Sequence, residues 1–540
     1  MHCLLKFPIV GGKIPPTIYR RAKIRYKTSL FIKHVFLVWT HFVSYIKKHR
    51  KNGKVYLSEV ESKRIDGKVV TKHIRYIGKE VDGEAIISTS ISDIEVKQVK
   101  VYGPLMILNH IAQEIDLPSL LGEYSDEILS MVYAHCLDYK SVNHMPAWFK
   151  RTDLNMILDI DELTEHRLLR ALDSLEKTDP TILQKMIFES VQNKYGIKSN
   201  GVVYDVTNTY FYGKKCELGK LGKDKDGVKG RPLIQIGLGV TQADAVPVFH
   251  KTFHGNIHDS RTFQDMITSF REYGIKHGII VFDRGISSKQ NQINIDEMKW
   301  KVLCGLPIGA GIKKHLRSAI KNKNFVTLKN RVKLNKTVFY VKVIPYSIAD
   351  IKGKLAFCFN EKKSRTLKES RYDEIVHAKK MISEGKEIKD GLKKYFRANG
   401  SLDMRSIKAA EELDGYSAIF TTTTLSKEHM VKLYFDKDLV EKAFQSMKGI
   451  INLRPVRHWL YNRVIAHVFL CYLSYLLMSI LKIKLKKIEI SPQQALREVD
   501  TFYKVYLKDE KKDFKFHKVV ALNKLQEKII KAIGNNLINE

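Results

Sequence analysis

The chain contains 540 residues, 44% of them apolar and 28% charged, which describes a folded protein of about three or four domains and excludes a disordered chain. Lysine and arginine number 93 against 58 aspartate and glutamate, and this net charge of +35 points to a polyanionic partner, most commonly nucleic acid. The six cysteines form no Cys-x-x-Cys pair, which argues against a disulfide framework or a structural zinc site and suits a reducing cytoplasm.

The first segment, residues 1–45, is a strongly basic N-terminal extension. Thirteen lysines and arginines precede Glu59, the first acidic residue of the chain. The segment is compatible with an arm that follows the DNA backbone, with a transit-like peptide, or with an upstream extension that has no fold of its own. We assign no function to it.

Residues 46–100 are predicted to form a basic β-hairpin region. Two β-rich runs flank Ile65-Asp66-Gly67, and Asp-Gly between such runs is a strong hairpin signal. The basic side chains on this ribbon are Lys63, Arg64, Lys68, Lys72 and Arg75. A basic ribbon suits a contact with DNA, and it equally suits a solvated hairpin.

Residues 101–198 are predicted to form a helical DNA-binding domain. In Leu163–Leu175, apolar residues recur at helical spacing, and Thr164 is placed to cap the helix. Asp179-Pro180-Thr181 opens a further helix, because proline is favoured in the first helical turn. The pattern predicts packed helices but identifies no DNA bases.

Residues 199–300 are predicted to form the first part of an α/β core with a mixed sheet. From Gly201 the periodicity changes to two, and Asp205 falls in the middle of a strand, where aspartate is disfavoured. Two more strands follow in PLIQIGLGVTQ and VPVFHKTFHG, which predicts an antiparallel meander.

A helix is expected next, from about Ser260 to Tyr273, with Asp259 or Ser260 as its cap. The apolar run Ile279–Phe282 then predicts a strand buried on both faces, and Asp283 ends this strand. In open α/β sheets, ligands bind at the carboxyl ends of strands. Asp283 is therefore a candidate site residue.

Residues 301–412 are predicted to be a β-rich domain inserted into this core, and residues 413–485 its second part. From Met298 to Ala349 there are twelve lysines and arginines and no acidic residue, among short β-like runs. Strand character resumes at Tyr416–Thr423. A basic β-rich insertion suits a clamp on the DNA backbone.

A helix from about Tyr434 to Ile451 carries the densest group of candidate site residues. At about 100° per residue, Tyr434, Lys437, Glu441 and Lys448 fall within one stripe about 60° wide. Apolar residues occupy the opposite and adjoining arc, so the helix buries one side and presents a carboxylate flanked by amines. An ordinary amphipathic surface helix has the same stripe, so the function of this helix depends on residues elsewhere in the chain.

The most apolar stretch, Val464–Ile483, is about long enough to span a bilayer. It carries His467 and follows directly from Asn462 and Arg463. We therefore predict a buried core helix and no membrane contact. Residues 486–540 are predicted to be a helical tail.

Three carboxylates stand out from these elements, Asp205, Asp283 and Glu441, at intervals of 78 and 158 residues. Phosphodiester cleavage with two metal ions needs hard oxygen ligands that converge, so that the ions lie about 4 Å apart. Carboxylates from two strands and one helix meet this need. The remaining acidic candidates lie in loops or at a helix start, where a capping role explains the last two: Asp224, Asp226, Asp436 and Asp438.

Three blocks of the chain, YDVTNTYF, FDRG and Tyr434-x2-Lys437-x3-Glu441-x6-Lys448, resemble the catalytic blocks of DDE transposases of bacterial insertion sequences. The most similar group has a Tyr-x2-Arg-x3-Glu-x6-Lys signature and a β-rich insertion before the glutamate. The resemblance covers about residues 200–485 and implies an RNase H-like core. Lysine at position 437, where the group usually has arginine, keeps the charge and loses the bidentate fork.

The resemblance also implies roles, reaction and partners. Asp205, Asp283 and Glu441 would be catalytic and bind two Mg²⁺ or Mn²⁺ ions, while Tyr434, Lys437 and Lys448 would contact DNA phosphates. The reaction would be hydrolysis at the end of the element, followed by attack of the freed 3′-OH on target DNA. The partners would be double-stranded DNA, both terminal repeats and target, and a second copy of the chain in a homodimer. A cytoplasmic, nucleoid-associated protein is expected.

Two alternatives remain open at this point. One is a catalytically silent DNA-binding relative of a transposase. The other is a different RNase H-like nuclease, which would cut without a preference for terminal repeats.

Overall fold

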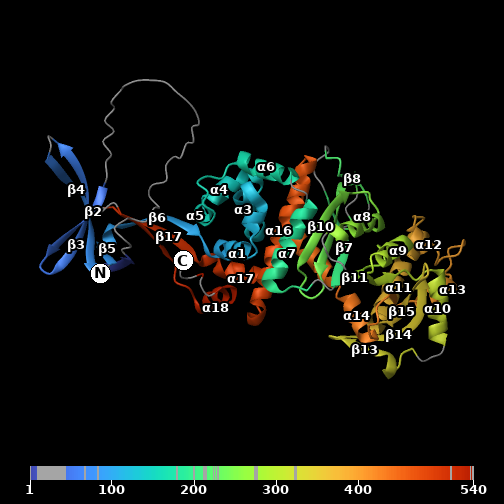
Figure 1. The fold of residues 1–540 in the computed structure, drawn as a ribbon. Helices are drawn as coiled ribbons and strands as arrows, with labels where there is room; N and C mark the ends of the chain where they lie inside the picture. The colour runs from blue at the N-terminus through green and yellow to red at the C-terminus, as the bar shows by residue number, and fades with distance from the viewer. Residues whose placement is uncertain are drawn as a thin grey trace, which may run out of the picture. The chain divides into compact units, whose positions relative to one another are not determined.

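The computed structural model describes residues 2–8, 44–65, 68–81, 84–177, 180–198, 201–210, 216–222, 224, 225, 227, 230–272, 278–321, 325–510, 514–534 and 537. Most of the predicted extension 1–45 and also Asp226 lie outside these residues. The chain forms two compact units, Met1–Tyr102 with Thr501–Ala521, and Gly103–Asp500 with Leu522–Glu540 (Figure 1). Each unit is described by itself below.

The first unit contains a five-stranded antiparallel sheet in the order β1-β5-β4-β3-β2. Its strands are β1 (His2–Pro8), β2 (Ser44–Lys51), β3 (Lys54–Ile65), β4 (Lys68–Val81) and β5 (Glu84–Ser90). β3 and β4 pair from Ile65 opposite Lys68 to Val55 opposite Glu80, which confirms the predicted hairpin. Its turn, Asp66-Gly67, lies outside the described residues. Arg75 pairs with Glu59 across this hairpin at 2.7 Å, so part of the ribbon's positive charge is already neutralised.

A three-stranded sheet, β18-β17-β6, completes the first unit. It joins β6 (Ile94–Val101) to β17 (Tyr503–Asp509) and β18 (Phe514–Val519). The predicted helical tail, residues 486–540, is therefore wrong in part, because it contributes two strands besides α17 (Pro492–Glu498) and α18 (Lys524–Ile533). The alternation of Tyr503, Val505 and Leu507 with polar residues is a period of two, the pattern of a strand.

The second unit is built on a ten-stranded mixed sheet in the order β10-β9-β7-β11-β12-β16-β15-β14-β13, with β8 paired to β9. β11 runs parallel to β7 and β12, and the other neighbours are antiparallel. The strands are β7 (Gly201–Tyr210), β8 (Lys220–Leu221), β9 (Pro232–Thr241), β10 (Pro247–His254), β11 (Ile279–Phe282), β12 (Lys301–Leu306), β13 (Arg331–Leu334), β14 (Thr337–Ile348), β15 (Ile351–Phe359) and β16 (Tyr416–Thr421).

The predicted β-rich insertion, residues 301–412, does not form a sheet of its own. β15 pairs with β16, so that β13, β14 and β15 extend the sheet that contains β7 and β11. Leu355–Cys358 of β15 are consecutive buried residues, as expected of a strand covered on both faces. The rest of the insertion is helical: α10 (Ala310–Lys321), α11 (Glu361–Ser383), α12 (Asp390–Lys393) and α13 (Met404–Glu411).

Helix α16 (Tyr461–Lys484) is the centre of the helical part. It packs against α3 (Ser125–Leu137), α6 (Glu165–Ser174) and α1 (Gly103–Glu114), and also against β10 of the sheet (Figure 1). Its most apolar window is 94% buried inside the protein, which confirms the prediction of a core helix. Because α16 is apolar on all sides, it needs cover on all sides. The helices of residues 101–198 therefore share one compact unit with the sheet, rather than forming a separate domain.

The other helices that precede the sheet or cover it are α2 (Leu117–Leu121), α4 (Met145–Phe149), α5 (Leu154–Ile157), α7 (Pro180–Tyr195), α8 (Asp259–Glu272) and α9 (Lys289–Glu297). Thr164 caps α6 as predicted, by accepting a hydrogen bond from the amide of Arg167 at 3.3 Å. α7 packs on β10 and α8 on β9.

The predicted helix Tyr434–Ile451 is two helices, α14 (Lys427–Phe435) and α15 (Asp438–Gly449). At the break the backbone turns more tightly, because the amides of Lys437 and Leu439 bond to carbonyls three residues back, at 3.3 and 2.9 Å. Asp436 and Asp438 flank the break, and aspartate is a poor helix former that competes for backbone hydrogen bonds. The prediction of one continuous helix is therefore wrong, because Tyr434 belongs to α14 whereas Glu441 and Lys448 belong to α15.

Candidate active site

Asp205 and Asp283 lie level with each other on neighbouring parallel strands. Val203 of β7 pairs with Val281 of β11, and each aspartate follows two residues later. Strands in a sheet are about 4.8 Å apart, and residues two apart share a face. Paired residues of β7 and β11 are 78 positions apart in sequence, and so are the two aspartates. The aspartates therefore occupy equivalent positions on the two strands.

Packing on the two faces of the sheet sets the direction of Asp205. The ring of its neighbour Tyr204 packs against Phe263 of α8, with centroids 5.3 Å apart. Alternation along β7 then directs Asp205 to the opposite face. Strand β7 also contacts α15, the helix that carries Glu441.

Burial dominates the electrostatics of Asp205. It raises the pKa of this carboxyl to about 6, against the opposing effects of the Lys225 ammonium, the Val206 amide and Lys437. Lys225 donates hydrogen bonds to the carbonyl of Val206 at 2.5 Å and to Asp259 Oδ2 at 3.1 Å. Asp205 is therefore a carboxylate poorly compensated by its protein surroundings, which favours the approach of a cation.

Asp283 has the opposite character. Its Oδ1 accepts hydrogen bonds from the Tyr434 hydroxyl at 3.0 Å and from the Arg284 amide at 2.8 Å, and its Oδ2 lies 3.2 Å from Lys437 Nζ. Burial acts to raise the pKa of Asp283, but Lys437, the Arg284 amide and Tyr434 together hold it below its usual value. Asp283 is held ionised by three donors.

Lys437 links the third carboxylate to the other two. Its Nζ lies 3.5 Å from Glu441 Oε1, one turn further along α15, besides its contact with Asp283. Burial acts to lower the pKa of Lys437, but Asp283 and Glu441 outweigh it and raise the pKa above the usual value. Asp205 also stabilises this charge. The Lys437 ammonium therefore bridges Asp283 and Glu441, and Asp205 lies level with Asp283 on the neighbouring strand.

The structure brings together five of the six residues predicted for the site. Tyr434 is 7% exposed, and a Cβ at Gly305 would lie 2.2 Å from its hydroxyl, so this side chain is enclosed and faces Asp283. Lys437 contacts two of the carboxylates. Lys448 lies seven residues beyond Glu441, about 10.5 Å further along α15.

Two further residues lie at the site, Lys225, which the sequence analysis did not single out, and Asp259, to which it gave only a capping role. Asp259 was expected to cap α8, but its carboxylate forms an ion pair with Lys225 at 3.1 Å. The Lys225 amide donates to Asn208 Oδ1 at 3.2 Å, which fixes this part of the basic loop beside β7. Nothing in the sequence of this Gly-rich basic loop indicates that Lys225 contacts the preceding strand, β7.

The other acidic candidates stand apart from this group. Asp436 is the C-cap residue of α14, and burial raises its pKa. Asp438 is exposed in the first turn of α15, a position in which its charge favours the helix dipole. Asp438 therefore has the expected position at a helix start, whereas Asp436 ends the preceding helix and caps no helix start.

The donor set at this site fits hard divalent cations. Three carboxylates supply the oxygen ligands that Mg²⁺ and Mn²⁺ prefer, and a monovalent cation, the Lys437 ammonium, already lies against two of them. Among the described residues, the ligand atoms of His135, His467 and Cys471 lie within 4.8 Å of one another. The oxygens of the three carboxylates are not gathered as closely as this. Closer convergence of the carboxylates requires the ammonium to move.

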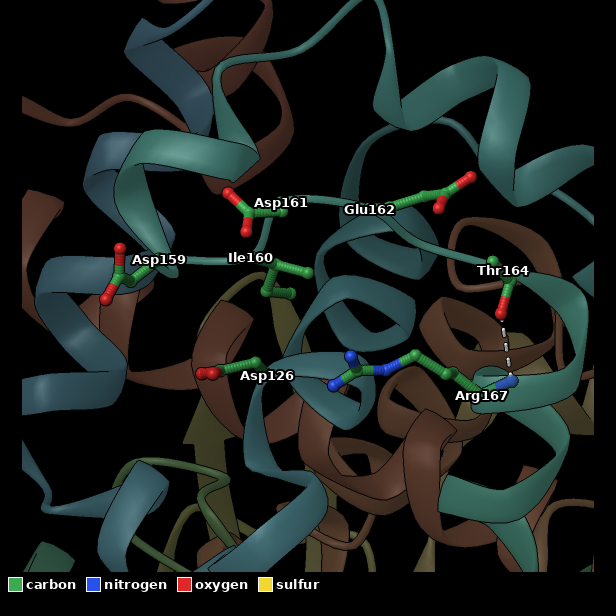
Figure 2. Close-up of a pocket in the computed structure, with 7 residues that line it drawn as sticks. All are labelled: Asp126, Asp159, Ile160, Asp161, Glu162, Thr164 and Arg167. Atoms are coloured by element: carbon green, nitrogen blue, oxygen red, sulfur yellow. Dashed lines mark hydrogen bonds between the residues drawn. The ribbon is translucent and has the colours of Figure 1, made fainter. Parts of the chain in front are cut away.

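A separate hollow of about 270 Å³ lies on the helical part of the second unit. Its lining residues are Asp126, Asp159, Ile160, Asp161, Glu162, Thr164 and Arg167 (Figure 2). Four carboxylates and one guanidinium line it, and Arg167 is itself paired with the buried Glu127. The hollow shares no residue with the carboxylate site, and its charge has the wrong sign for DNA.

Comparison with known proteins identifies a family for most of this unit. The family model described as Transposase DDE domain matches residues 198–477, which is 280 of the 540 residues. One solved structure, the "piggyBac transposase synaptic complex with hairpin DNA", aligns with 74% of this chain and 80% of its own at 9% identity, with a TM-score of 0.37. No curated protein matches the chain. Because the matched domain spans more than half of the chain and contains all three carboxylates, the chain belongs to the DDE transposase domain family.

Proposed function

We propose that the protein is a transposase of a bacterial insertion sequence that cuts DNA at the ends of its element and joins the freed 3′ ends to target DNA. Asp205, Asp283 and Glu441 are the catalytic carboxylates, and they hold two Mg²⁺ or Mn²⁺ ions. The observation that carries this proposal is that Lys437 bridges Asp283 and Glu441, while Asp205 lies level with Asp283 on the adjacent strand.

The strand order supports an RNase H-like core. The five strands β10-β9-β7-β11-β12 comprise an antiparallel meander, then a parallel pair placed beside its first strand. Both aspartates lie on the first strand of the meander and the strand next to it, near the centre of the sheet. This topology agrees with the fold that the three sequence blocks imply.

The bound ions would supply an activated water and stabilise the leaving oxygen of the phosphodiester. The chain's own residues do the rest. Tyr434 and the Arg284 amide fix the orientation of Asp283 through its Oδ1. Lys437, which contacts Asp283 and Glu441, would contact a phosphate oxygen of DNA bound beside them. Lys448, two turns along α15, extends this basic edge along the DNA strand.

The DNA partner is proposed from charge and from the family. A net charge of +35 is sufficient for sequence-independent attraction to phosphates, which weakens as salt rises. Recognition of terminal repeats and target DNA, and assembly as a homodimer across paired ends, are part of the same proposal.

The test compares the wild-type chain with Asp205→Asn, Asp283→Asn and Glu441→Gln on DNA that carries the element's own ends. Cleavage in Mg²⁺ should fall by more than about 10³-fold in each variant, because a metal ligand is worth several kcal/mol. DNA binding should persist. Asp438→Asn, a neighbouring carboxylate on α15, is the matched control and should cut normally.

Two results would reject the proposal. Full cleavage by any one of the three variants would remove that residue from the catalytic group. Equal cutting of DNA without the terminal repeats would favour a general RNase H-like nuclease over a transposase.

A further inference from the structure

His135, His467 and Cys471 form a second group of ligand atoms, separate from the catalytic carboxylates. All three residues are buried, and their ligand atoms lie within 4.8 Å of one another. Cys471 Sγ is 4.0 Å from His135 Nδ1 and 3.9 Å from His467 Nε2. His467 and Cys471 are four residues apart on α16 and therefore share one face of the helix. His135 approaches this face from α3.

We propose that this group is a structural site for a zinc-class divalent ion, with His135, His467 and Cys471 as ligands. The absence of a Cys-x-x-Cys pair argued against such a site, but a site with a single cysteine needs no such pair. Nitrogen and sulfur donors are the set that Zn²⁺ prefers, in contrast to the oxygen set of the catalytic site. The chain thus carries two chemically distinct metal sites.

The spacing of the donors is close to what the ion requires. Zinc bonds of about 2.3 Å to sulfur and about 2.05 Å to nitrogen place the two donors about 3.5 Å apart in a tetrahedron. The observed separations of 3.9 and 4.0 Å exceed this by about 0.4 Å. The two ring nitrogens lie within 4.8 Å of each other, and a tetrahedral ion needs them about 3.3 Å apart. Binding therefore requires side-chain rotations of the ligands. The ring of His458 lies nearby, with its centroid 5.7 Å from that of His467.

The protonation of the group is also compatible with binding. Burial lowers the pKa of His135 to about 4 and lowers that of His467 well below its usual value, so both rings are neutral, the form that coordinates metals. The ligand nitrogens face the carbonyls of Ile451 and Leu453, at 2.5 and 3.2 Å. Burial raises the pKa of the Cys471 thiol, so the ion itself must supply the charge that stabilises the thiolate. On binding, each ring would carry its proton on the other nitrogen, and the thiol proton would pass to solvent.

The site connects directly to the catalytic helix. Ile451 and Leu453 follow α15, and the Leu453 amide bonds to the carbonyl of Met447 on that helix at 2.8 Å. An ion bound by the same two ring nitrogens would replace their contacts with Ile451 and Leu453, and would therefore change how the segment after α15 is held. The ion would act on stability, and not in the chemical step.

The experiment uses the full-length protein without DNA, loaded with Zn²⁺ or Co²⁺ and freed of excess metal by gel filtration. Metal analysis should find one tightly bound ion per chain in the wild type and less than about 0.2 in Cys471→Ser. Co²⁺-loaded wild type should show thiolate-to-cobalt charge-transfer absorption, which carboxylate sites do not give. Cys358→Ser, a buried cysteine of β15 outside the group, is the matched control and should behave as wild type.

Metal content and the Co²⁺ spectrum can be measured without DNA cleavage. They are also read from the wild type and a second variant, besides Cys471→Ser. Wild-type protein that retains no Zn²⁺ and shows no Co²⁺–thiolate band would overturn the site. So would full metal retention by Cys471→Ser or by a folded His467→Gln variant. Loss of the catalytic activity in the carboxylate variants, with zinc content unchanged, would leave this inference intact.

Discussion

The hydroxyl of Tyr434 donates a hydrogen bond of 3.0 Å to Asp283 Oδ1, which joins the end of α14 to the end of β11 across 151 residues of sequence. Tyr434 is enclosed rather than solvent-facing, since 7% of the residue is exposed. Its hydroxyl is bonded to a carboxylate, whereas the sequence motif suggested a DNA phosphate. We infer that Tyr434 is a positioning residue for Asp283.

Replacing Tyr434 by phenylalanine tests this role. Hydrogen bonds to charged groups contribute about 1.5–3 kcal/mol, and part of this should appear as lost positioning, so we expect kcat for end cleavage to fall about tenfold. The dissociation constant for DNA and its salt dependence should not change. A weaker, less salt-dependent complex with unchanged kcat would instead assign Tyr434 to a phosphate contact.

Gly305 gives an independent test of the same contact. A Cβ at this position would lie 2.2 Å from the Tyr434 oxygen, and 3.2 Å from the Arg284 amide nitrogen. Gly305→Ala should therefore displace the tyrosine and lower kcat to about the level of Tyr434→Phe.

The double variant Tyr434→Phe/Gly305→Ala should lose much less than the product of the two single effects, because both disrupt one interaction. Gly309→Ala, with no atom within 4 Å of the added Cβ, is the control and should cut normally. Fully multiplicative losses in the double variant would show that Gly305 acts elsewhere, for example on the packing of β12.

Local patterns in the sequence were sufficient for the strands that carry the aspartates. Ile279–Phe282 is bounded in the structure as predicted, because a short apolar run before Asp-Arg-Gly leaves little choice. The pairing that places the two aspartates level with each other could not be predicted from local patterns, because β7 and β11 are far apart in the sequence. The sequence of the predicted insertion does not indicate which sheet its strands join. In the structure they join the core sheet, because β15 pairs with β16.

The site also shows which contacts a sequence motif leaves undetermined. The motif groups Tyr434, Lys437 and Glu441 on one helical stripe, but the helix breaks between Tyr434 and Glu441. Contacts with Asp283 nevertheless bring Tyr434 and Lys437 to one carboxylate. Lys225 and Asp259 come from a loop and a helix start, whose side-chain partners depend on tertiary packing.

Lys437 should compete with divalent cations for the carboxylates. A unit charge about 4 Å away at an effective dielectric constant near 20 costs about 4 kcal/mol, and even a third of this is tenfold in affinity. Lys437→Met should therefore bind Mn²⁺ at least about tenfold more tightly, as measured by calorimetry without DNA. Lys442→Met, an exposed lysine on the same helix, should leave the affinity unchanged. Unchanged or weaker Mn²⁺ binding in Lys437→Met would contradict the competition.

Asp205 and Asp283 should have opposite effects on the stability of the metal-free protein. The pKa of Asp205 is raised from 3.8 to about 6, so between these values the folded chain binds more protons than the unfolded chain. The free energy of unfolding should fall by about 3 kcal/mol as pH rises through this range and stay low above it. The pKa of Asp283 is lowered, so its contribution is present at neutral pH and is lost in acid.

The two amide variants in EDTA separate these effects. At pH 7.5, Asp205→Asn should raise the free energy of unfolding by up to about 3 kcal/mol and remove the loss of stability between pH 4 and 6, although the variant cannot cut. Asp283→Asn should instead lower stability at pH 7.5, because the Lys437 and Tyr434 contacts lose their charged partner. Mg²⁺ should stabilise the wild type and have little effect on either variant. Denaturant unfolding at several pH values measures all three, and a destabilised Asp205→Asn would show that this buried carboxylate is already compensated within the protein.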